Sequence, residues 1–260
     1  MATEPRRFVH VVIEPRAAGV VARITIDNAT KLNIVGSPLL AELVTAVASL
    51  GARDDLRAVV LSGAGERAFI GGADIREMVS LDAARAREFI TQVHRACAAL
   101  RGFPVPVIAR INGLALGAGL EIAAACDLRV AASNAVFGMP EVRVGIPSVI
   151  EAALLPALIG WGRTRELLLL GENIDAETAL RWGLVERVVP AERLDEAVEA
   201  CLAALLKGGQ RAVRLQKKLI REWEDLPVSG AIAAGIDCFA DAYATDEPSR
   251  LMRAFLDRPR

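Results

Sequence analysis

Glu121 is the one carboxylate of an apolar helix predicted within residues 112–127, NGLALGAGLEIAAACD. The Gly and Ala residues at the start of this helix leave few Cβ atoms to hold a ligand away from the backbone. The first helical turn also has unpaired N–H groups and the positive end of the helix dipole, which suits an oxygen that gains negative charge. A carboxylate among apolar neighbours is costly unless it is partnered or functional. The segment indicates either a site that stabilises an anion beside an acidic side chain, or a tightly packed helix with a glutamate at its edge.

A second loop of similar composition lies earlier in the chain. The apolar run RAVVLS, residues 57–62, is a candidate for a strand covered on both faces, and GAGERAFIGGADIREM follows it at residues 63–78. This loop offers backbone N–H groups near Gly72 and Ala73, and Asp74 is placed to cap the next helix. The GxxxxGK[ST] spacing of a phosphate loop is missing, so a nucleotide phosphate site is not predicted.

A second carboxylate that could do chemistry lies in residues 133–147, SNAVFGMPEVRVGIP. Two prolines and two glycines argue against regular structure here, and an apolar loop that lines a cleft fits the composition. Glu141 lies in the middle of this loop, next to Pro140. Taken alone, it would be interpreted as a surface glutamate.

Composition excludes several other kinds of chemistry. The chain has 31 basic and 32 acidic residues without a basic cluster, so neither a nucleic acid nor a membrane surface is an expected partner. The N-terminus lacks the apolar run of a signal peptide, which predicts a cytoplasmic protein. The four cysteines are far apart and predict reduced thiols, and the two histidines are in no ligand-like spacing, so no metal site is expected. The chemistry then falls to carboxylates and backbone N–H groups.

The elements that must position these groups alternate between strands and helices over most of the chain. Strands are predicted at residues 8–13, 20–26, 57–62, 105–111, 128–132 and 184–189. Ser37 is predicted to be the N-cap of a helix that begins with Pro38 and ends at Gly51. Further helices are predicted at residues 81–101, 152–159 with an interruption at Pro156, 163–170, 175–182, 191–207, 210–223, 229–243 and 248–256. The change to helices alone near Pro190 predicts a boundary between residues 1–190 and 191–260.

Four segments together resemble the enoyl-CoA hydratase/isomerase (crotonase) family, in the family's order and spacing. They are AFIGGADIREM, NGLALGAGLEIAAACD, FGMPEVRVGIP and LGENIDAETALRWGLVERVVP, and the resemblance runs from about Val20 to the C-terminal AFLDRPR. It implies an α/β fold in which a spiral of ββα units is followed by a C-terminal helical trimerisation region. Residues 1–190 would form the core with the acyl-CoA site, and residues 191–260 would form the oligomerisation region. The resemblance also implies a homotrimer or a dimer of trimers.

The resemblance further implies an acyl-CoA thioester as substrate. By position, the family's oxyanion hole falls on the backbone N–H groups of Ala73 and Ala118, and its two catalytic glutamates fall on Glu121 and Glu141. Arg258 would reach a CoA phosphate. The residues expected to bind CoA and substrate are Gly72, Ala73, Asp74, Ile75, Arg76 and Gly117.

These assignments predict an enoyl-CoA hydratase. Adding water to a 2-enoyl thioester builds negative charge on the thioester oxygen, and losing one of two N–H donors there typically costs about 3 kcal/mol or more. We expect Glu121 to act as the base that activates water and Glu141 as the acid that protonates Cα, with no metal or redox cofactor. Family members that only shift a double bond commonly lack the carboxylate matching Glu121. The alternatives are an acyl-CoA isomerase or hydrolase on the same scaffold, or a non-catalytic acyl-CoA-binding or RNA-binding relative.

The chain departs from the family pattern after Glu141. In GIPSVIEAALLP one residue fewer separates Glu141 from the Ile-Pro pair, and Ser148 and Glu151 replace residues that are usually small and uncharged. They indicate either altered helix packing beside the acyl pocket or a Glu151 that orients water or selects a polar acyl group, so the acyl chain is left unassigned. Ala118 replaces a common glycine, but only its N–H is needed.

Overall fold

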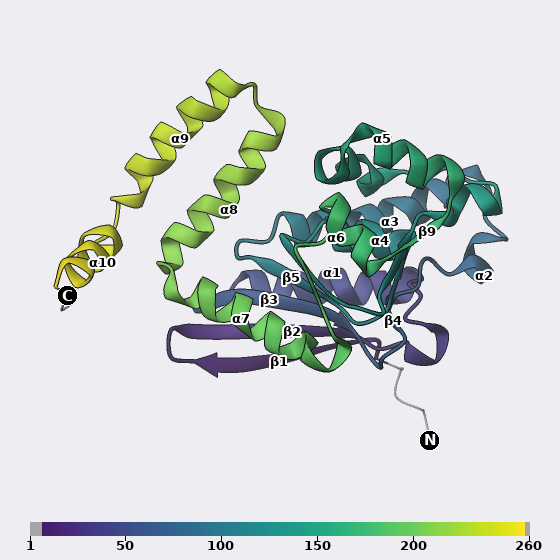
Figure 1. Ribbon diagram of the computed structural model, residues 1–260, viewed down its shortest axis with the longest axis horizontal. Coiled ribbons are helices and arrows are strands. Elements are labelled where there is room, and N and C mark those ends of the chain that lie inside the picture. Colours follow the sequence, from purple (N-terminus) through teal and green to yellow (C-terminus); the bar gives the residue numbers. More distant parts are fainter. Residues whose placement is uncertain (1–6, 258–260) are drawn as a thin grey trace.

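The computed structural model describes residues 7–257, and Figure 1 shows two sheets with helices packed beside them. Arg258, one of the predicted binding residues, lies outside the described residues. The larger sheet has the strand order β1 (Val9–Arg16), β2 (Gly19–Ile26), β3 (Leu56–Gly63), β5 (Val107–Ile111), β7 (Leu128–Ala132) and β10 (Arg187–Val189). The smaller sheet has the order β4 (Ala68–Ile70), β6 (Leu114–Leu116), β8 (Val136–Gly138) and β9 (Asn173–Asp175).

The chain alternates between the two sheets in a repeated ββα pattern, as the sequence predicts. It adds β3 to the large sheet and β4 to the small one, then β5 and β6, then β7 and β8. Within each sheet these successive strands pair in parallel. Because parallel strands end at the same edge of a sheet, the loops that follow β4, β6 and β8 emerge together.

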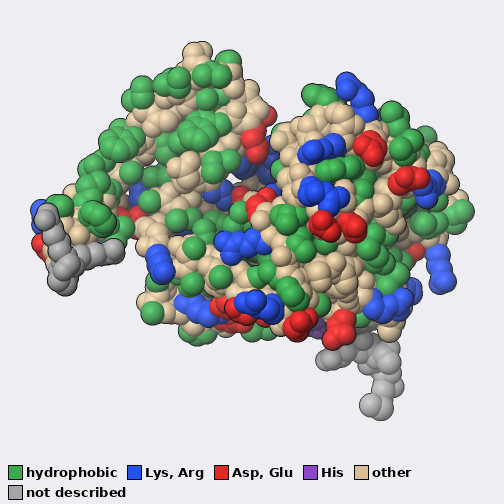
Figure 2. Space-filling model, viewed as in Figure 1, with side chains coloured by type: hydrophobic (Ala, Val, Ile, Leu, Met, Phe, Trp, Pro, Cys, Tyr) green, Lys and Arg blue, Asp and Glu red, His purple; other side chains and the backbone are tan. Residues whose placement is uncertain are grey.

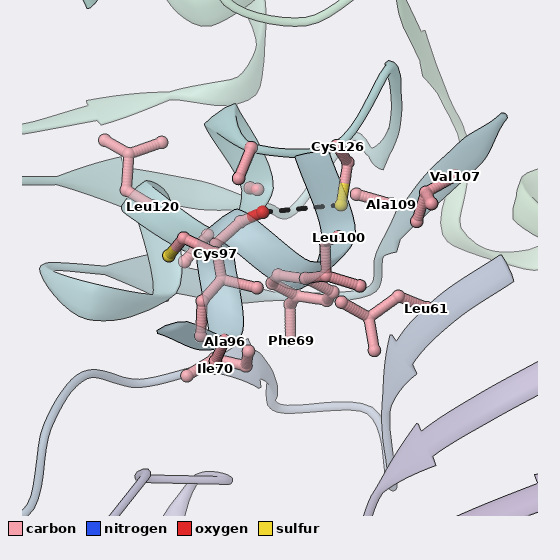
Figure 3. Packing of buried hydrophobic residues seen from close by; sticks show 14 of the residues in the cluster. Leu61, Phe69, Ile70, Ala96, Cys97, Leu100, Val107, Ala109, Leu120 and Cys126 are labelled. Carbon is pink, nitrogen blue, oxygen red and sulfur yellow. Dashed lines mark hydrogen bonds between the residues drawn. The ribbon is translucent and has the colours of Figure 1, made fainter. Parts of the chain in front are cut away.

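The middle of the large sheet is buried on both faces, which explains the continuous apolar run of β3 at residues 58–61, whereas the edge strand β1 is largely exposed. Val59 and Leu61 belong to the main core, whereas Ala58 and Val60 on the other face pack against α7 (Leu194–Lys207). The main core also contains the buried sides of α1 (Ser37–Gly51), α3 (Ala83–Arg101) and α4 (Ala118–Ala124). In Figure 3, side chains of α3 and α4 interleave with those of β4, and Cys126 Sγ donates a hydrogen bond of 3.3 Å to the Ile122 carbonyl.

The remaining helices either pack beside the two sheets or extend away from them. Beside the sheets lie η1 (Ala29–Lys31), α2 (Ile75–Met78), η2 (Pro140–Val144), η3 (Ile150–Leu154), α5 (Leu155–Leu170), α6 (Ala176–Trp182) and η4 (Ala191–Arg193). The last three helices, α8 (Gln210–Asp225), α9 (Val228–Ala242) and α10 (Glu247–Leu256), extend from the body as an arm in Figure 1. No helix within residues 7–257 is long and apolar enough to cross a membrane.

A buried ion pair ties the arm to the body. Lys217 of α8 is 5% exposed, and its Nζ donates to Asp127 Oδ2 at 2.6 Å and to the Val105 carbonyl at 3.0 Å. Burial lowers the pKa of Lys217, while the charge of Asp127 opposes this shift. Removing one partner of such a pair would leave an uncompensated buried charge, so the pair fixes where the arm leaves the body.

Several predicted boundaries are wrong. The N-cap of α1 is Gly36, and Ser37 is its first residue, because the Ser37 hydroxyl donates to Glu77 instead of capping the helix. Pro156 does not interrupt a helix but lies in the first turn of α5, where its missing N–H costs nothing. The break in α5 comes at Gly160, whose φ is 77°.

The segment at 133–147 contains the strand β8, and β10 is shorter than the predicted strand at 184–189. The division of the chain at residue 190 stays a prediction.

Candidate active site

Three loops meet where β4, β6 and β8 end. Gly72 has a φ of 125°, and a Cβ added there would lie only 3.5 Å from the Leu116 carbonyl oxygen, so the first two loops are in contact. The Gly117 N–H donates a hydrogen bond of 2.9 Å to the Gly138 carbonyl, which joins the second loop to the third. The two Gly-rich segments and the Glu141 loop therefore form one site.

Two backbone N–H groups in these loops are available to a ligand. Ala118 is the first residue of α4, and the N–H groups of a first helical turn have no partner within the helix. Ala73 lies in a parallel bridge with Val35 in which the Val35 N–H donates to the Gly72 carbonyl and the Asp74 N–H donates to the Val35 carbonyl. This pattern leaves the Ala73 N–H outside the bridge. Across the described part of the chain, neither amide has a hydrogen-bond acceptor.

Glu121 lies in the first turns of α4 and is only 4% exposed. Its Oε1 accepts a hydrogen bond of 3.2 Å from the Ala152 N–H. Burial raises the pKa of Glu121 to about 8, the Ala152 N–H opposes this shift, and the charges of Glu141 and Glu151 add to it. The protonated form of Glu121 therefore predominates at pH 7. A carboxyl group that gains and loses its proton near neutral pH suits general acid-base catalysis.

Glu141 follows β8 in η2 and packs against the start of α4. Its Oε2 accepts a hydrogen bond of 2.8 Å from the Ser148 hydroxyl. A Cβ added at Gly117 would lie 2.6 Å from Glu141 Oε1, closer than real Cβ contacts allow, and Gly117 has a φ of 52°. Glycine is needed there both for the backbone conformation and for the approach of the carboxylate. The Glu141 carboxylate thus lies against Gly117, the residue that precedes Ala118 and its free N–H.

The other predicted binding residues lie beside this centre. The Asp74 side chain caps α2 by accepting from the Arg76 N–H at 2.9 Å, as predicted. Ile75 is 60% exposed and Arg76 is also exposed, so they form a solvent-facing stretch next to Ala73. Ser148 lines a cavity of about 610 Å³ together with Ala152 and the exposed Trp161.

Sequence reasoning missed two residues of the site, His94 and Ala152. The Nδ1 of His94, on α3, lies 2.9 Å from Oε1 of the buried Glu151. The two are 57 positions apart, and neither periodicity nor motif spacing connects them. The only available signal was the unpaired acid in GIPSVIEAALLP, because a buried carboxylate requires a hydrogen-bond donor. The contact of the Ala152 N–H with Glu121 could not be predicted from the residue type, because the alanine side chain carries no polar atom.

Known proteins resemble this chain over nearly its whole length. Residues 16–260 match the family model described as Enoyl-CoA hydratase/isomerase. The short-chain-enoyl-CoA hydratase of Clostridium acetobutylicum is 35% identical over 241 residues, which is 92% of each chain. The crotonyl-CoA hydratase of Syntrophomonas wolfei is 36% identical over 238 residues, or 91% of this chain and 92% of that protein. The crystal structure of an enoyl-CoA hydratase from Bacillus anthracis has a TM-score of 0.91 at 31% identity and covers 96% of both chains.

Proposed function

The chain belongs to the enoyl-CoA hydratase/isomerase family, and we propose that it is an enoyl-CoA hydratase, which converts a 2-enoyl-CoA thioester and water to a 3-hydroxyacyl-CoA. The observation that carries this proposal is the convergence of two carboxyl groups, Glu121 and Glu141, on the start of α4. Hydration requires one group to take a proton from water and another to give a proton to Cα. A site with both carboxyls can do this without rearrangement.

The two free amides support activation of the thioester. In the proposed complex, the carbonyl oxygen accepts from the Ala73 and Ala118 N–H groups. As water attacks C3, the π electrons of the double bond move toward that oxygen, and the resulting enolate is stabilised by both donors. The positive end of α4 adds to the stabilisation, because Ala118 begins the helix.

Glu121 and Glu141 then carry the protons. Ionised Glu121 takes a proton from water while the oxygen of that water bonds to C3. Protonated Glu141 gives its proton to C2 as the enolate returns to a carbonyl. One proton then passes from Glu121 to Glu141 through water to reset the site. Water addition changes no net oxidation state, so the proposed reaction requires no redox cofactor, and the two N–H donors are proposed to stabilise the enolate charge in place of a metal ion.

The exposed stretch at residues 74–76 is proposed to hold the CoA part of the substrate, together with Gly72, Ala73 and Gly117. CoA is large, charged and hydrated, and a solvent-facing backbone segment next to the oxyanion donors fits it. The cavity that Ser148 lines is proposed to take the acyl chain. Because its lining is largely apolar, short and medium aliphatic chains are the expected substrates.

Incubation with crotonyl-CoA tests the function. Loss of the absorbance of the conjugated thioester, without release of free thiol, is expected. Release of free thiol would identify a hydrolase instead. Absorbance that appears from a 3-enoyl-CoA, with no loss from crotonyl-CoA, would identify an isomerase. A stable RNA complex at physiological salt, with no turnover of any acyl-CoA, would refute enzymatic function.

Substitution of Glu141 tests its proposed role as the acid. We expect Glu141→Gln to lower turnover of crotonyl-CoA by at least about a hundredfold, the low end for general acid-base catalysis. Binding of a CoA thioester, measured by calorimetry, should change little, because the CoA contacts lie on another loop. Turnover equal to that of the unmodified protein would remove Glu141 from the mechanism.

The protein is further proposed to form a homotrimer or a dimer of trimers in the cytoplasm. Figure 2 shows many hydrophobic side chains on the arm. On α9 of the arm, the exposed fractions of Ile232, Ile236 and Phe239 lie between 61% and 67%. An apolar helix face of this kind is typical of a subunit interface. Light scattering is expected to give a trimer or hexamer mass, and Ile236→Glu with Phe239→Glu should yield monomers. A monomeric unmodified protein would contradict the assembly.

A further inference from the structure

Glu151 is a third carboxylate behind the proposed site, and its hydrogen bonding is incomplete. It is 6% exposed, its Oε1 accepts from His94 Nδ1, and its buried Oε2 has no N–H or O–H donor among the described residues, where the weak S–H donor of Cys97 is the other group that contacts the carboxylate. Burying a carboxylate oxygen without a donor costs free energy that an aliphatic side chain of similar size would not. Packing alone therefore does not explain this residue.

The backbone that presents Glu151 is strained. Ile150, the residue before it, has a φ of 41°. A β-branched residue in the left-handed region is an outlier that costs free energy and persists only where the surroundings enforce it. At this bend the Glu151 side chain meets α3, through His94, while the next N–H, that of Ala152, meets α4. The strained residue thus belongs to a segment that contacts α3 on one side and α4 on the other.

The segment holds Glu121 through one N–H group. The Ala152 N–H donates to the Val149 carbonyl at 2.9 Å and also to Glu121 Oε1 at 3.2 Å. A shared donor of this kind is sensitive to small shifts of the backbone, because both acceptors depend on its direction. Anything that fixes η3 therefore fixes the carboxyl group of Glu121.

Glu151 faces α3 and not the proposed acyl pocket. It lines a cavity of about 410 Å³ with His94 and Arg101 of α3, whereas Ser148 and Ala152 line a different cavity, of about 610 Å³. The titratable groups around Glu121 are Glu141 from η2, Glu151 from η3 and Cys97 from α3. Burial, together with the charges of Glu151 and Glu121, holds the pKa of the Cys97 thiol well above its usual value, so this thiol stays neutral.

We propose that Glu151, held by His94, is a positioning residue for Glu121: the pair fixes η3 so that the Ala152 N–H meets the Glu121 carboxyl group. This proposal rests on the proposed hydratase function. The negative charge of Glu151 also disfavours the ionised form of Glu121, which makes the ionised form a stronger proton acceptor. Neither His94 nor Glu151 contacts the reacting atoms.

Four variants test the pair by crotonyl-CoA hydration. Glu151→Gln keeps the shape of the side chain and removes its charge, and His94→Leu removes the donor at a position whose side chain is 53% exposed. His94→Asn retains an N–H donor near the place of Nδ1. Arg95→Leu is the control, because Arg95 is the next, exposed residue of α3. Each variant is measured for kcat, for KM and for the pH dependence of kcat/KM, with thermal unfolding as the check on folding.

We expect Glu151→Gln and His94→Leu to lower kcat about tenfold or more with KM nearly unchanged, because a misplaced catalytic group loses rate and not binding. The midpoint of the pH profile of Glu151→Gln should move to lower pH, since a like charge beside Glu121 is gone. His94→Asn should recover most of the lost kcat, and Arg95→Leu should match the unmodified protein.

Two results overturn the proposal. One is a Glu151→Gln variant with unchanged kcat and an unchanged pH midpoint. The other is a His94→Asn variant as slow as His94→Leu, which would mean that the donor is irrelevant. If the hydratase proposal itself is wrong, the unmodified protein will not hydrate crotonyl-CoA at all. That outcome differs from the two results above, in which the unmodified protein is active.

Discussion

The raised pKa of Glu121 predicts an unusual pH dependence of hydration. In the proposed mechanism Glu121 and Glu141 share one proton, because hydration needs Glu121 ionised while Glu141 carries the proton. Burial places the pKa of Glu121 at about 8. The fraction of the pair that keeps the shared proton is then about 0.9 at pH 7 and about 0.1 at pH 9, so kcat/KM should fall about tenfold between these values. A proton held with the ordinary pKa of 4.5 would be lost well below pH 7, and the fall would then begin near pH 5.

The assay follows the initial loss of crotonyl-CoA absorbance at substrate concentrations well below KM, so that the rate reports the free enzyme. The reverse reaction gives a check with the same protein. Dehydration of 3-hydroxybutyryl-CoA uses the same pair with the shared proton on Glu121, and the overall equilibrium involves no proton, so its kcat/KM should show the same fall past about pH 8. Glu121→Gln is the control, and the residual activity of this variant should not show this fall.

A hydration rate that is flat or rises between pH 7 and pH 9 would refute this reasoning. A flat profile would mean that the shared proton is held more tightly than a pKa of about 8 allows. A rise would mean that the fully deprotonated pair is the active form, which contradicts the proposed role of Glu141 as the acid.

Three further predictions concern the same site. First, because the pKa of Glu121 is higher in the folded chain than in the unfolded one, the folded state binds more protons between about pH 4.5 and pH 8, and stability is lost as pH rises through this window. Glu121→Gln should abolish this loss, which amounts to at most about 5 kcal/mol, and urea unfolding at pH 5 and pH 8 measures it; equal pH dependence in both proteins would count against the raised pKa. Second, Ser148→Ala removes the hydroxyl that donates to Glu141 at 2.8 Å, and kcat should fall about tenfold because a less firmly oriented acid loses rate. An unchanged kcat would show that the bond does not persist with substrate. Third, Gly117→Ala should lower kcat at least about a hundredfold through overlap with Glu141, whereas Gly145→Ala, with a φ of 83° but nothing within 4 Å of its added Cβ, should cost only stability. Equal kcat in these two variants would argue against the overlap.

Much of the fold could be predicted from local signals. The continuous apolar run at residues 57–62 predicted β3, whose two faces are indeed covered. Helices that end at residues 170 and 182 were also predicted, and each is followed by a glycine in the left-handed conformation, Gly171 with φ of 62° and Gly183 with φ of 82°. These features depend on neighbouring residues alone, so the sequence shows them directly.

The small sheet could not be predicted in the same way. Its strands β4, β6, β8 and β9 have three residues each, too few for a periodic pattern. They exist because distant segments pair, as Ala68 does with Leu114, and pairing partners leave no local trace. The loops that bear the site residues were therefore found through composition and motif, not through the strands that hold them.

The site residues themselves were predicted by motif, and the roles assigned to them stay predictions. The structure brings Glu121, Glu141 and Ser148 together. The raised pKa of Glu121 was beyond sequence reasoning, because it arises from burial by segments far apart in the chain. The same holds for the contact between His94 and Glu151, which depends on how α3 packs against η3.

The proposed carbonyl-activating donors belong to the main chain, and this affects how the protein can diverge. Every amino acid except proline supplies an amide N–H, so random codon changes at Ala73 or Ala118 rarely delete a donor. Selection at these two positions then acts on side-chain size and backbone shape and not on chemical identity. Descendants of this gene can therefore exchange acidic groups and acquire different reactions while they keep both N–H donors for the thioester oxygen.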